Sequence, residues 1–195
     1  LSRLWNYSIN KEISDIDIYK ELRLKNPSPF SALVRYNKSS IISSSPERLL
    51  SINDSHLETR PIAGTRPRGK SGLTDVQLSN ELINSDKEQA EQLMVVDLER
   101  NDISRVCKPG SVKVDEMMSI ESYAHVHHIV SNISGKLRDD VFPLDAIKAV
   151  FPGGTITGCP KVRCMEILGE LERDGRGPYT GSIGYLTHKG NLDFN

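Results

Sequence analysis

Two glutamates share one face of a predicted helix near the middle of the chain. Glu88 and Glu91 are three residues apart in a segment, residues 85–103, whose apolar spacing predicts a helix. Paired carboxylates on a rigid element suit Mg²⁺, which takes one or two protein carboxylates and keeps several waters. However, Ser85-Asp86-Lys87-Glu88 also has the pattern of a capping box, and acidic residues stabilise helix N-termini. Spacing alone favours the capping role over the metal site.

Three histidines cluster in a predicted strand, residues 125–137. Because side chains alternate along a strand, His125 and His127 should point to one side and His128 to the other. That arrangement is poor for a zinc site built from neighbouring histidines. The pattern therefore favours a hydrogen-bonded core histidine over a catalytic one.

Two glycine-rich segments could receive an anion. Residues 61–69 are basic and predicted to form a loop, and residues 151–161 lead into a predicted helix N-terminus. Free backbone N–H groups and the helix dipole favour a carboxylate or phosphate at such a place. Neither segment has the Walker A or dinucleotide-binding glycine pattern. A site for a small anionic molecule and two tight loops in a core remain equally open interpretations.

The elements that must position these residues come in blocks. Short strands are predicted at residues 31–36, 39–44 and 48–52, after a helix at residues 15–24. The later elements are helices at 75–84, 85–103, 144–150 and 160–172, strands at 111–114 and 125–137, and a closing hairpin from residue 182. Blocks of strands and helices favour the α+β class over strict βα alternation.

Composition narrows the class of protein further. The 195 residues are 37% hydrophobic and 26% charged, which suits one globular domain. A net charge of -1 disfavours nucleic-acid binding, and no apolar run approaches the roughly 20 residues of a membrane helix. Three cysteines without metal-ligand spacing, and no signal peptide at Leu1, indicate a cytoplasmic protein with reduced thiols. The closing hairpin stops as its second strand begins, so we expect a fragment truncated at both ends.

Six segments taken in order resemble the chorismate-binding enzymes, which include anthranilate synthase component I and aminodeoxychorismate synthase component I. They include Ser45-Pro46-Glu47-Arg48 and Gly181-Ser-Ile-Gly-Tyr185. The other four are residues 61–69, 88–102, 125–131 and 151–161. The resemblance covers essentially the whole chain. It implies a single partial catalytic domain over residues 1–195, with antiparallel β-sheets and helices packed outside.

The resemblance implies a role for each matching residue. Glu91, with Glu88 beside it, would belong to a Mg²⁺ site that neutralises the ring carboxylate of chorismate. Glu47 would be the general acid that protonates the departing C4 hydroxyl, and His128 would sit against the ring near that group.

Four further residues would bind the substrate. Gly64, Thr65 and Thr155 would line the ring site, and Tyr179 would contact the enolpyruvyl carboxylate.

The same motifs favour one branch of the family. The implied reaction is Mg²⁺-dependent addition of ammonia at C2 of chorismate with loss of the C4 hydroxyl, giving 4-amino-4-deoxychorismate. Ammonia would come from a glutamine amidotransferase subunit. Ala63 stands where some relatives carry a nucleophilic lysine, which implies direct attack by ammonia. The alternative within the family is anthranilate synthase component I.

Truncation affects the expected activity. In the family, an arginine and a second acidic segment of the Mg²⁺ site lie in sequence that would follow Asn195. We therefore expect that the 195-residue chain alone does not turn over chorismate. Two other classes stay open, namely an inactive module that binds a partner, and a carboxylate-binding domain unrelated to chorismate.

Overall fold

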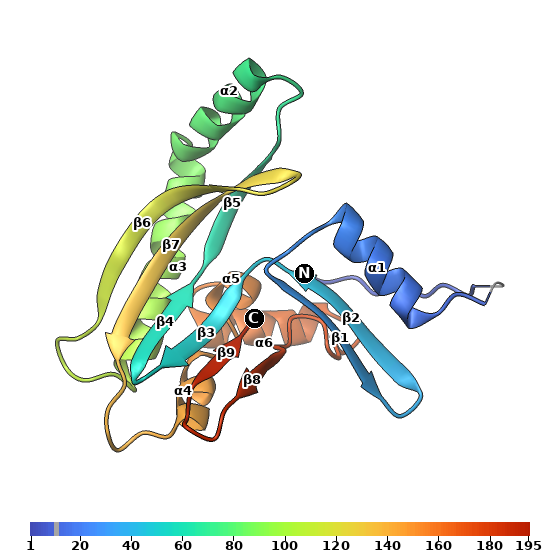
Figure 1. Ribbon diagram of the computed structural model, residues 1–195. Coiled ribbons are helices and arrows are strands. Elements are labelled where there is room, and N and C mark those ends of the chain that lie inside the picture. The colour runs from blue at the N-terminus through green and yellow to red at the C-terminus, as the bar shows by residue number, and fades with distance from the viewer. Residues whose placement is uncertain (10–11) are drawn as a thin grey trace.

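The computed structural model describes residues 1–9 and 12–195 and contains one large antiparallel sheet (Figure 1). Its strands are β3 (Arg48–Asn53), β4 (His56–Arg60), β5 (Ile62–Pro67), β6 (Lys113–Ser122), β7 (Val126–Lys136), β8 (Gly184–Leu186) and β9 (Leu192–Phe194). The strand order is β5-β7-β4-β3-β9-β8, and β6 pairs with β7. The hairpin predicted at the end of the chain is confirmed, and its second strand, β9, is hydrogen-bonded to both β3 and β8.

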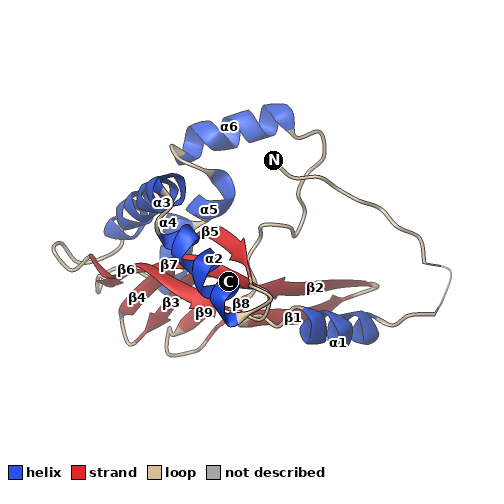
Figure 2. Ribbon diagram, turned by 90° about the horizontal axis from the view of Figure 1, so that it is seen from above, coloured by secondary structure: helices blue, strands red, loops and turns tan. Residues whose placement is uncertain are grey.

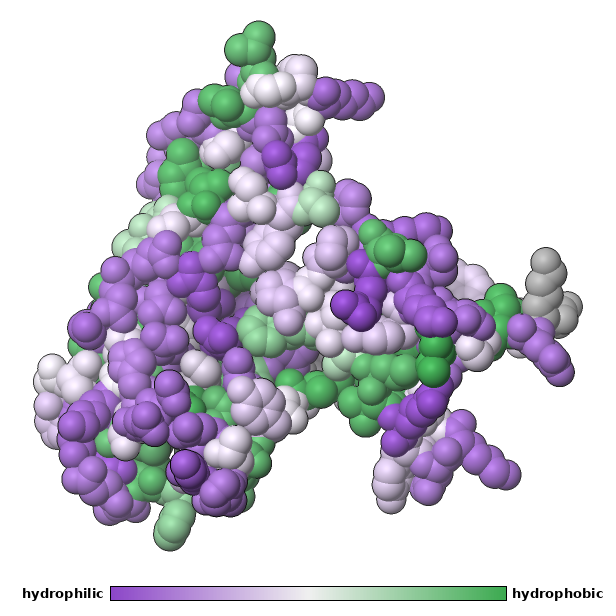
Figure 3. Space-filling view, in the orientation of Figure 1, coloured by the Kyte–Doolittle hydropathy of each residue, from purple (hydrophilic) through white to green (hydrophobic). Residues whose placement is uncertain are grey.

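A separate arm carries the first elements of the chain. It consists of α1 (Asp15–Lys25) and a two-stranded sheet formed by β1 (Phe30–Tyr36) and β2 (Ser39–Ser45). Figure 3 shows a notch in the surface between this arm and the lobe that carries α2 (Gly72–Ile83). The predicted helix 15–24 and the first three predicted strands are confirmed within one or two residues.

The remaining helices lie on one face of the large sheet (Figure 2). They are α3 (Asp86–Ser104), α4 (Pro143–Val150), α5 (Gly154–Thr157) and α6 (Lys161–Leu171). The strands follow one another in blocks, and the helices pack on one side of the sheet. This arrangement confirms the predicted α+β class. None of the helices in the described residues is long and apolar enough to cross a membrane.

Strand β7 organises the sheet because three strands pair with it. Strands β4 and β5 follow one another along one edge of β7, with Thr59 opposite Ile133 and Thr65 opposite His128. Strand β6 pairs with the other edge. The buried Gln92 amide on α3 donates to the Pro61 carbonyl at 3.3 Å and to Ser131 Oγ at 2.8 Å. These bonds fix the helix against the junction of β4 and β5.

Two secondary-structure predictions were wrong. Residues 61–69, predicted as a loop, mostly form β5, because a left-handed Gly64 (φ +84°) and a register shift between Ile62 and Thr65 absorb the glycine as a bulge. The strand predicted at 111–114 is the much longer β6. It runs to Ser122, because its pairing with β7 continues from Lys113 to Ser122, with exposed and half-buried residues alternating over the first six positions.

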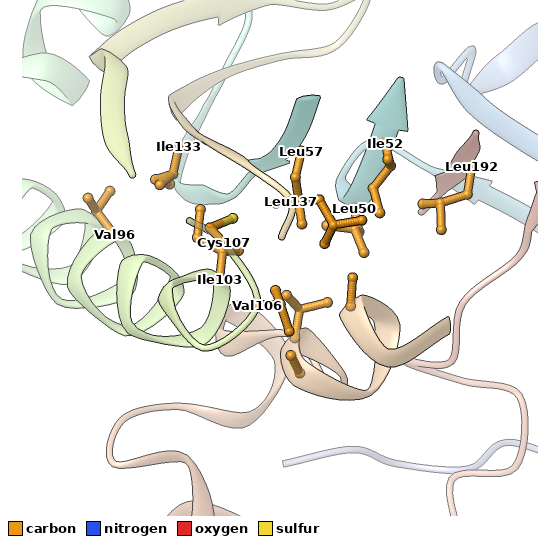
Figure 4. Packing of buried hydrophobic residues seen from close by; sticks show 13 residues of the cluster. Leu50, Ile52, Leu57, Val96, Ile103, Val106, Cys107, Ile133, Leu137 and Leu192 are labelled. Carbon is orange, nitrogen blue, oxygen red and sulfur yellow. The ribbon is translucent and has the colours of Figure 1, made fainter. Parts of the chain in front are cut away.

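The hydrophobic core lies between the sheet and helices α3 and α4 (Figure 4). Leu50, Ile52 and Leu57 project from the sheet toward Ile103 at the end of α3 and toward Val150 on α4. Leu50, Leu57 and Ile103 are fully buried. This packing holds α3 at a fixed height above β5 and β7, which carry several of the predicted site residues.

The core can be tested with one matched pair of substitutions. Leu57→Ala should lower the free energy of unfolding by about 2–5 kcal/mol, because it removes buried methyl groups and leaves a cavity. Leu73→Ala, at a side chain that is 83% exposed on α2, should change it by less than about 0.5 kcal/mol. Urea unfolding of both variants measures the difference, and equal losses would contradict the assigned core.

Candidate active site

Glu47 occupies the short connection between β2 and β3 and is held through one of its two carboxyl oxygens. Oε1 accepts a hydrogen bond from Thr155 Oγ1 at 2.8 Å and from the backbone N–H of Ile62 at 3.2 Å. Burial raises the pKa of Glu47 from 4.5 to about 7, although both hydrogen bonds act in the opposite direction. The carboxyl therefore holds its proton in a large fraction of molecules near neutral pH, as a general acid must.

A cavity of about 540 Å³ opens beside Glu47. Glu47, Glu99, Thr155, Ile156 and Tyr179 are among its lining residues. A volume of this order suits a small organic molecule with a few fixed polar contacts. The predicted residues Glu47, Thr155 and Tyr179 thus meet at one cavity, although they come from three separate segments of the chain.

A second group of predicted residues lies where β5 pairs with β7. Thr65 Oγ1 and His128 Nδ1 are 2.8 Å apart, and the Tyr123 ring meets the His128 ring edge-on at 5.6 Å. Burial lowers the pKa of His128, so the imidazole is neutral at pH 7. Gly64 belongs to the same group, because its lack of a side chain leaves room for the Glu88 carboxylate. A Cβ added at Gly64 would lie only 3.0 Å from Glu88 Oε2.

The two groups are joined by β5 but do not share the cavity. Ile62, at the start of β5, donates to Glu47, and Gly64 and Thr65 follow two and three residues later. Gly64, Thr65 and His128 are not among the residues that line the 540 Å³ cavity in the described structure. The structure therefore places the predicted residues in two neighbouring clusters.

The two predicted metal ligands differ in environment. Glu88 is 9% exposed, and its Oε1 lies 3.2 Å from Arg66 Nη1, whereas Glu91 is exposed on the same helix. No cluster of three histidine, cysteine or acidic residues capable of holding a metal occurs in residues 1–9 and 12–195. Carboxylate oxygens are the ligand type that Mg²⁺ takes, but Glu88 is paired with Arg66 and Glu91 faces solvent.

Only one of the two hydrogen bonds of the predicted capping box forms at the start of α3. Ser85 Oγ accepts the Glu88 backbone N–H at 3.5 Å, as predicted. The Glu88 carboxylate is directed instead at Arg66, so its side chain does not complete the box. Arg66 on β5 binds the Glu88 carboxylate in place of the N-cap backbone N–H, because Glu88 is buried against that strand.

The strand does carry a buried, hydrogen-bonded histidine, but it is His127 and not His128, which shares its side of the strand with Val126 and Val130. The His127 side chain is 3% exposed, with Nδ1 2.7 Å from Ser122 Oγ and Nε2 2.9 Å from Asp75 Oδ1. It ties α2 to the β6–β7 hairpin as a hydrogen-bonded core residue. His128 points the other way, as predicted, whereas His125 precedes β7 and contacts the Lys25 carbonyl.

Sequence reasoning missed the site roles of Arg66 and Glu99. Arg66 bridges Glu81 and Glu88, and Glu99 lines the cavity beside Glu47. Helical spacing could have revealed Glu99. It lies on the face of α3 that buries Gln92, Val95 and Ile103, where an acidic residue is unexpected.

The fold and the site define an α+β domain with a proton-holding carboxyl at a small-molecule cavity. The chain belongs to the family of chorismate binding enzymes, whose model matches residues 1–195. It is 57% identical over 178 residues to aminodeoxychorismate synthase component 1 of Bacillus subtilis, covering 91% of this chain and 38% of that protein. It is 50% identical over 177 residues to anthranilate synthase component 1 of Aquifex aeolicus, covering 91% of this chain and 36% of that protein.

Solved structures show the same fold. Anthranilate synthase component I of Streptococcus pneumoniae superposes with a TM-score of 0.84 at 38% identity, over 93% of this chain and 40% of that one. An isochorismate synthase from Bacillus anthracis gives a TM-score of 0.82 at 24% identity, over 93% of this chain and 50% of that one, and supports the fold alone. The chain spans well under half the length of the curated relatives it matches.

The environment of Glu47 can be tested by removing one donor. Thr155→Val should raise the pKa of Glu47 above its value of about 7, because the Thr155 hydroxyl favours the charged carboxylate. The pKa is read by NMR titration of glutamate side-chain carbons labelled with ¹³C. Thr65→Val is the matched control, since its hydroxyl contacts His128 and should leave the pKa of Glu47 unchanged. A Glu47 pKa that stays the same or falls in Thr155→Val would contradict the assignment.

Proposed function

We propose that this chain is the part of a chorismate-aminating enzyme that carries the general acid. The observation that supports the proposal most is the state of Glu47, a carboxyl of raised pKa that faces the cavity. Oε1 takes both donors, which leaves Oε2 to carry the proton. Similarity to two kinds of component 1 enzyme supports chorismate as the substrate.

In the proposed reaction Glu47 gives its proton to the C4 hydroxyl of chorismate as the C–O bond breaks and water leaves. Ammonia forms a C–N bond at C2 while the ring double bond shifts, and the proton that the new ammonium group loses returns to Glu47. Atoms balance as chorismate plus ammonia giving aminated product plus water. His128, neutral and hydrogen-bonded to Thr65, would orient the ring from the neighbouring cluster.

The position of the nitrogen separates the two products. Addition at C2 leaves nitrogen on C2, whereas 4-amino-4-deoxychorismate carries it on C4. A 4-amino product therefore needs a second displacement, in which ammonia enters at C4 while the amine on C2 leaves. Ala63 offers no side-chain nucleophile, so ammonia itself would make the first attack. We favour the 4-amino product, in line with the 57% identity to the Bacillus subtilis protein.

Anthranilate is the second candidate product. The 2-amino intermediate would give it directly by losing pyruvate, without the second displacement. The 50% identity to the Aquifex aeolicus enzyme and the TM-score of 0.84 to the Streptococcus pneumoniae enzyme favour this alternative. The two products are distinguishable in one assay, because anthranilate fluoresces and 4-amino-4-deoxychorismate needs a lyase to become p-aminobenzoate.

The proposal also includes a Mg²⁺ ion, a glutamine amidotransferase partner and a cytoplasmic location. Glu91, with Glu88, would hold Mg²⁺, which would neutralise a substrate carboxylate and draw electron density from the ring, so that ammonia can add. Ammonia would reach the site from a glutamine amidotransferase subunit in the cytoplasm. These activities belong to the longer protein, and we propose that the 195-residue chain alone does not turn over chorismate.

Substitution of the acid gives the first test. In the longer protein that contains this chain, Glu47→Gln should lower kcat for chorismate amination by roughly 10²–10⁴-fold, because glutamine keeps the shape but holds no transferable proton. Glu170→Gln, on the exposed side of α6, should leave kcat unchanged. Product formation is followed with chorismate, ammonium and Mg²⁺. Full activity in Glu47→Gln would exclude Glu47 as the acid.

Metal binding gives an independent test in the longer protein that contains this chain, because the family resemblance implies a second acidic segment of the Mg²⁺ site after Asn195. Glu91→Gln should weaken Mg²⁺ binding, measured by calorimetry, by about tenfold, because it removes the exposed carboxylate of the pair. Arg66→Gln should strengthen it, since Glu88 then loses its competing cation. If Glu91→Gln and the control Glu170→Gln bind Mg²⁺ equally well, the proposed metal site is wrong.

A further inference from the structure

A second acidic side chain faces the cavity that Glu47 lines. Glu99, on the buried face of α3, is 8% exposed and is one of the residues lining the cavity. Its Oε2 is fully buried and has no hydrogen-bond partner among the described residues. A buried carboxylate oxygen without a donor is costly, so this geometry favours the protonated, uncharged acid.

The cations near Glu99 are paired with Asp102, so they would not neutralise a negative charge on the Glu99 carboxyl. Lys161 is the nearby cation, but its Nζ lies 2.6 Å from Asp102 Oδ2 and 2.8 Å from the Val150 carbonyl. Arg105 is directed at the same Asp102, at 3.1 Å. The Asp102 carboxylate thus holds both cations and remains a negative neighbour of Glu99.

Two further groups act on Glu99 in opposite directions. Glu47 lines the same cavity, whereas the buried Thr59 hydroxyl on β4, which makes no hydrogen bond of normal geometry in the described residues, is close enough to favour the charged carboxylate. Burial raises the pKa of Glu99 to about 8 and outweighs the Thr59 hydroxyl, which is the next largest effect and lowers it. The charges of Glu47 and Asp102 add to the rise, and Lys161 opposes it.

We propose that Glu99 is a second carboxylic acid of the cavity, kept uncharged so that a dicarboxylate can bind beside Glu47. It is a positioning residue, since it acts through the charge of the cavity wall and not on the reacting atoms. Chorismate is a dicarboxylate, so this role rests on the proposed function. The protonation of Glu99 itself does not, because it follows from burial, which outweighs the nearby Thr59 hydroxyl.

The charge state can be tested without substrate. The acid has a higher pKa folded than unfolded, so the stability it contributes is present below pH 4.5 and is lost as pH rises to about 8. Glutamine cannot lose a proton. The urea midpoint of Glu99→Gln should therefore fall less than that of the wild type between pH 5 and pH 8, whereas Glu170→Gln should follow the wild type. Parallel curves for Glu99→Gln and wild type would overturn the proposal.

A direct titration covers the case in which Glu99→Gln fails to fold. In the wild-type chain labelled with ¹³C at the glutamate carboxyl carbon, two signals should titrate above pH 6. Glu47→Gln should remove one of them and leave the other. If only the Glu47 signal titrates above pH 6, Glu99 is charged at neutral pH and the proposal fails.

The positioning role needs a ligand. Calorimetry with chorismate and Mg²⁺ should show wild-type Kd rising by roughly threefold or more from pH 7 to pH 9, and a flatter curve for Glu99→Gln. Equal pH dependence in both proteins would remove the positioning role while leaving the proposed function intact. If neither protein binds chorismate but the stability curves diverge as expected, the proposed function fails and the uncharged state of Glu99 stands.

Discussion

The site depends on a single carboxyl oxygen that accepts two hydrogen bonds. Glu47 Oε1 receives the Thr155 hydroxyl from α5 and the Ile62 amide from β5, and so joins three segments that are distant in sequence. Both donors stabilise the carboxylate, yet burial outweighs them and the pKa still rises to about 7. The consequence is an acid that is fixed in position by one oxygen and able to give a proton from the other.

Helix α3 supplies the second constraint, because polar residues interrupt its buried face. Gln92 is fully buried and bonds the Pro61 carbonyl, which sets where β5 begins and therefore where Ile62 meets Glu47. Glu88 and Glu99 lie one or two turns to either side on the same face. Arg66 forms an ion pair with Glu88, whereas Glu99 has no such partner among the described residues. One helix thus carries one buried glutamate that is paired with a cation and one that is not.

Much of this arrangement could be predicted from the sequence, and the failures have physical causes. Helices with clear apolar periodicity, such as α1 and α3, were predicted within a few residues. Residues 61–69 look like a loop because glycine and proline are turn residues, and only pairing with β7 makes most of them a strand. The sequence also could not predict which residues pair with the buried charged side chains. Arg66 and Glu88 are 22 residues apart, and nothing in local spacing indicates that they meet.

The proposed chemistry requires Glu47 to be a carboxylic acid that still holds its proton near neutral pH at the wall of a small-molecule cavity. The decisive experiment is a titration of its ¹³C-labelled carboxyl carbon in the wild-type chain, assigned by comparison with Glu47→Gln. We expect a midpoint near pH 7. A midpoint near 4.5, the ordinary value for glutamate, would show a charged carboxylate at neutral pH and would rule out Glu47 as the proton donor.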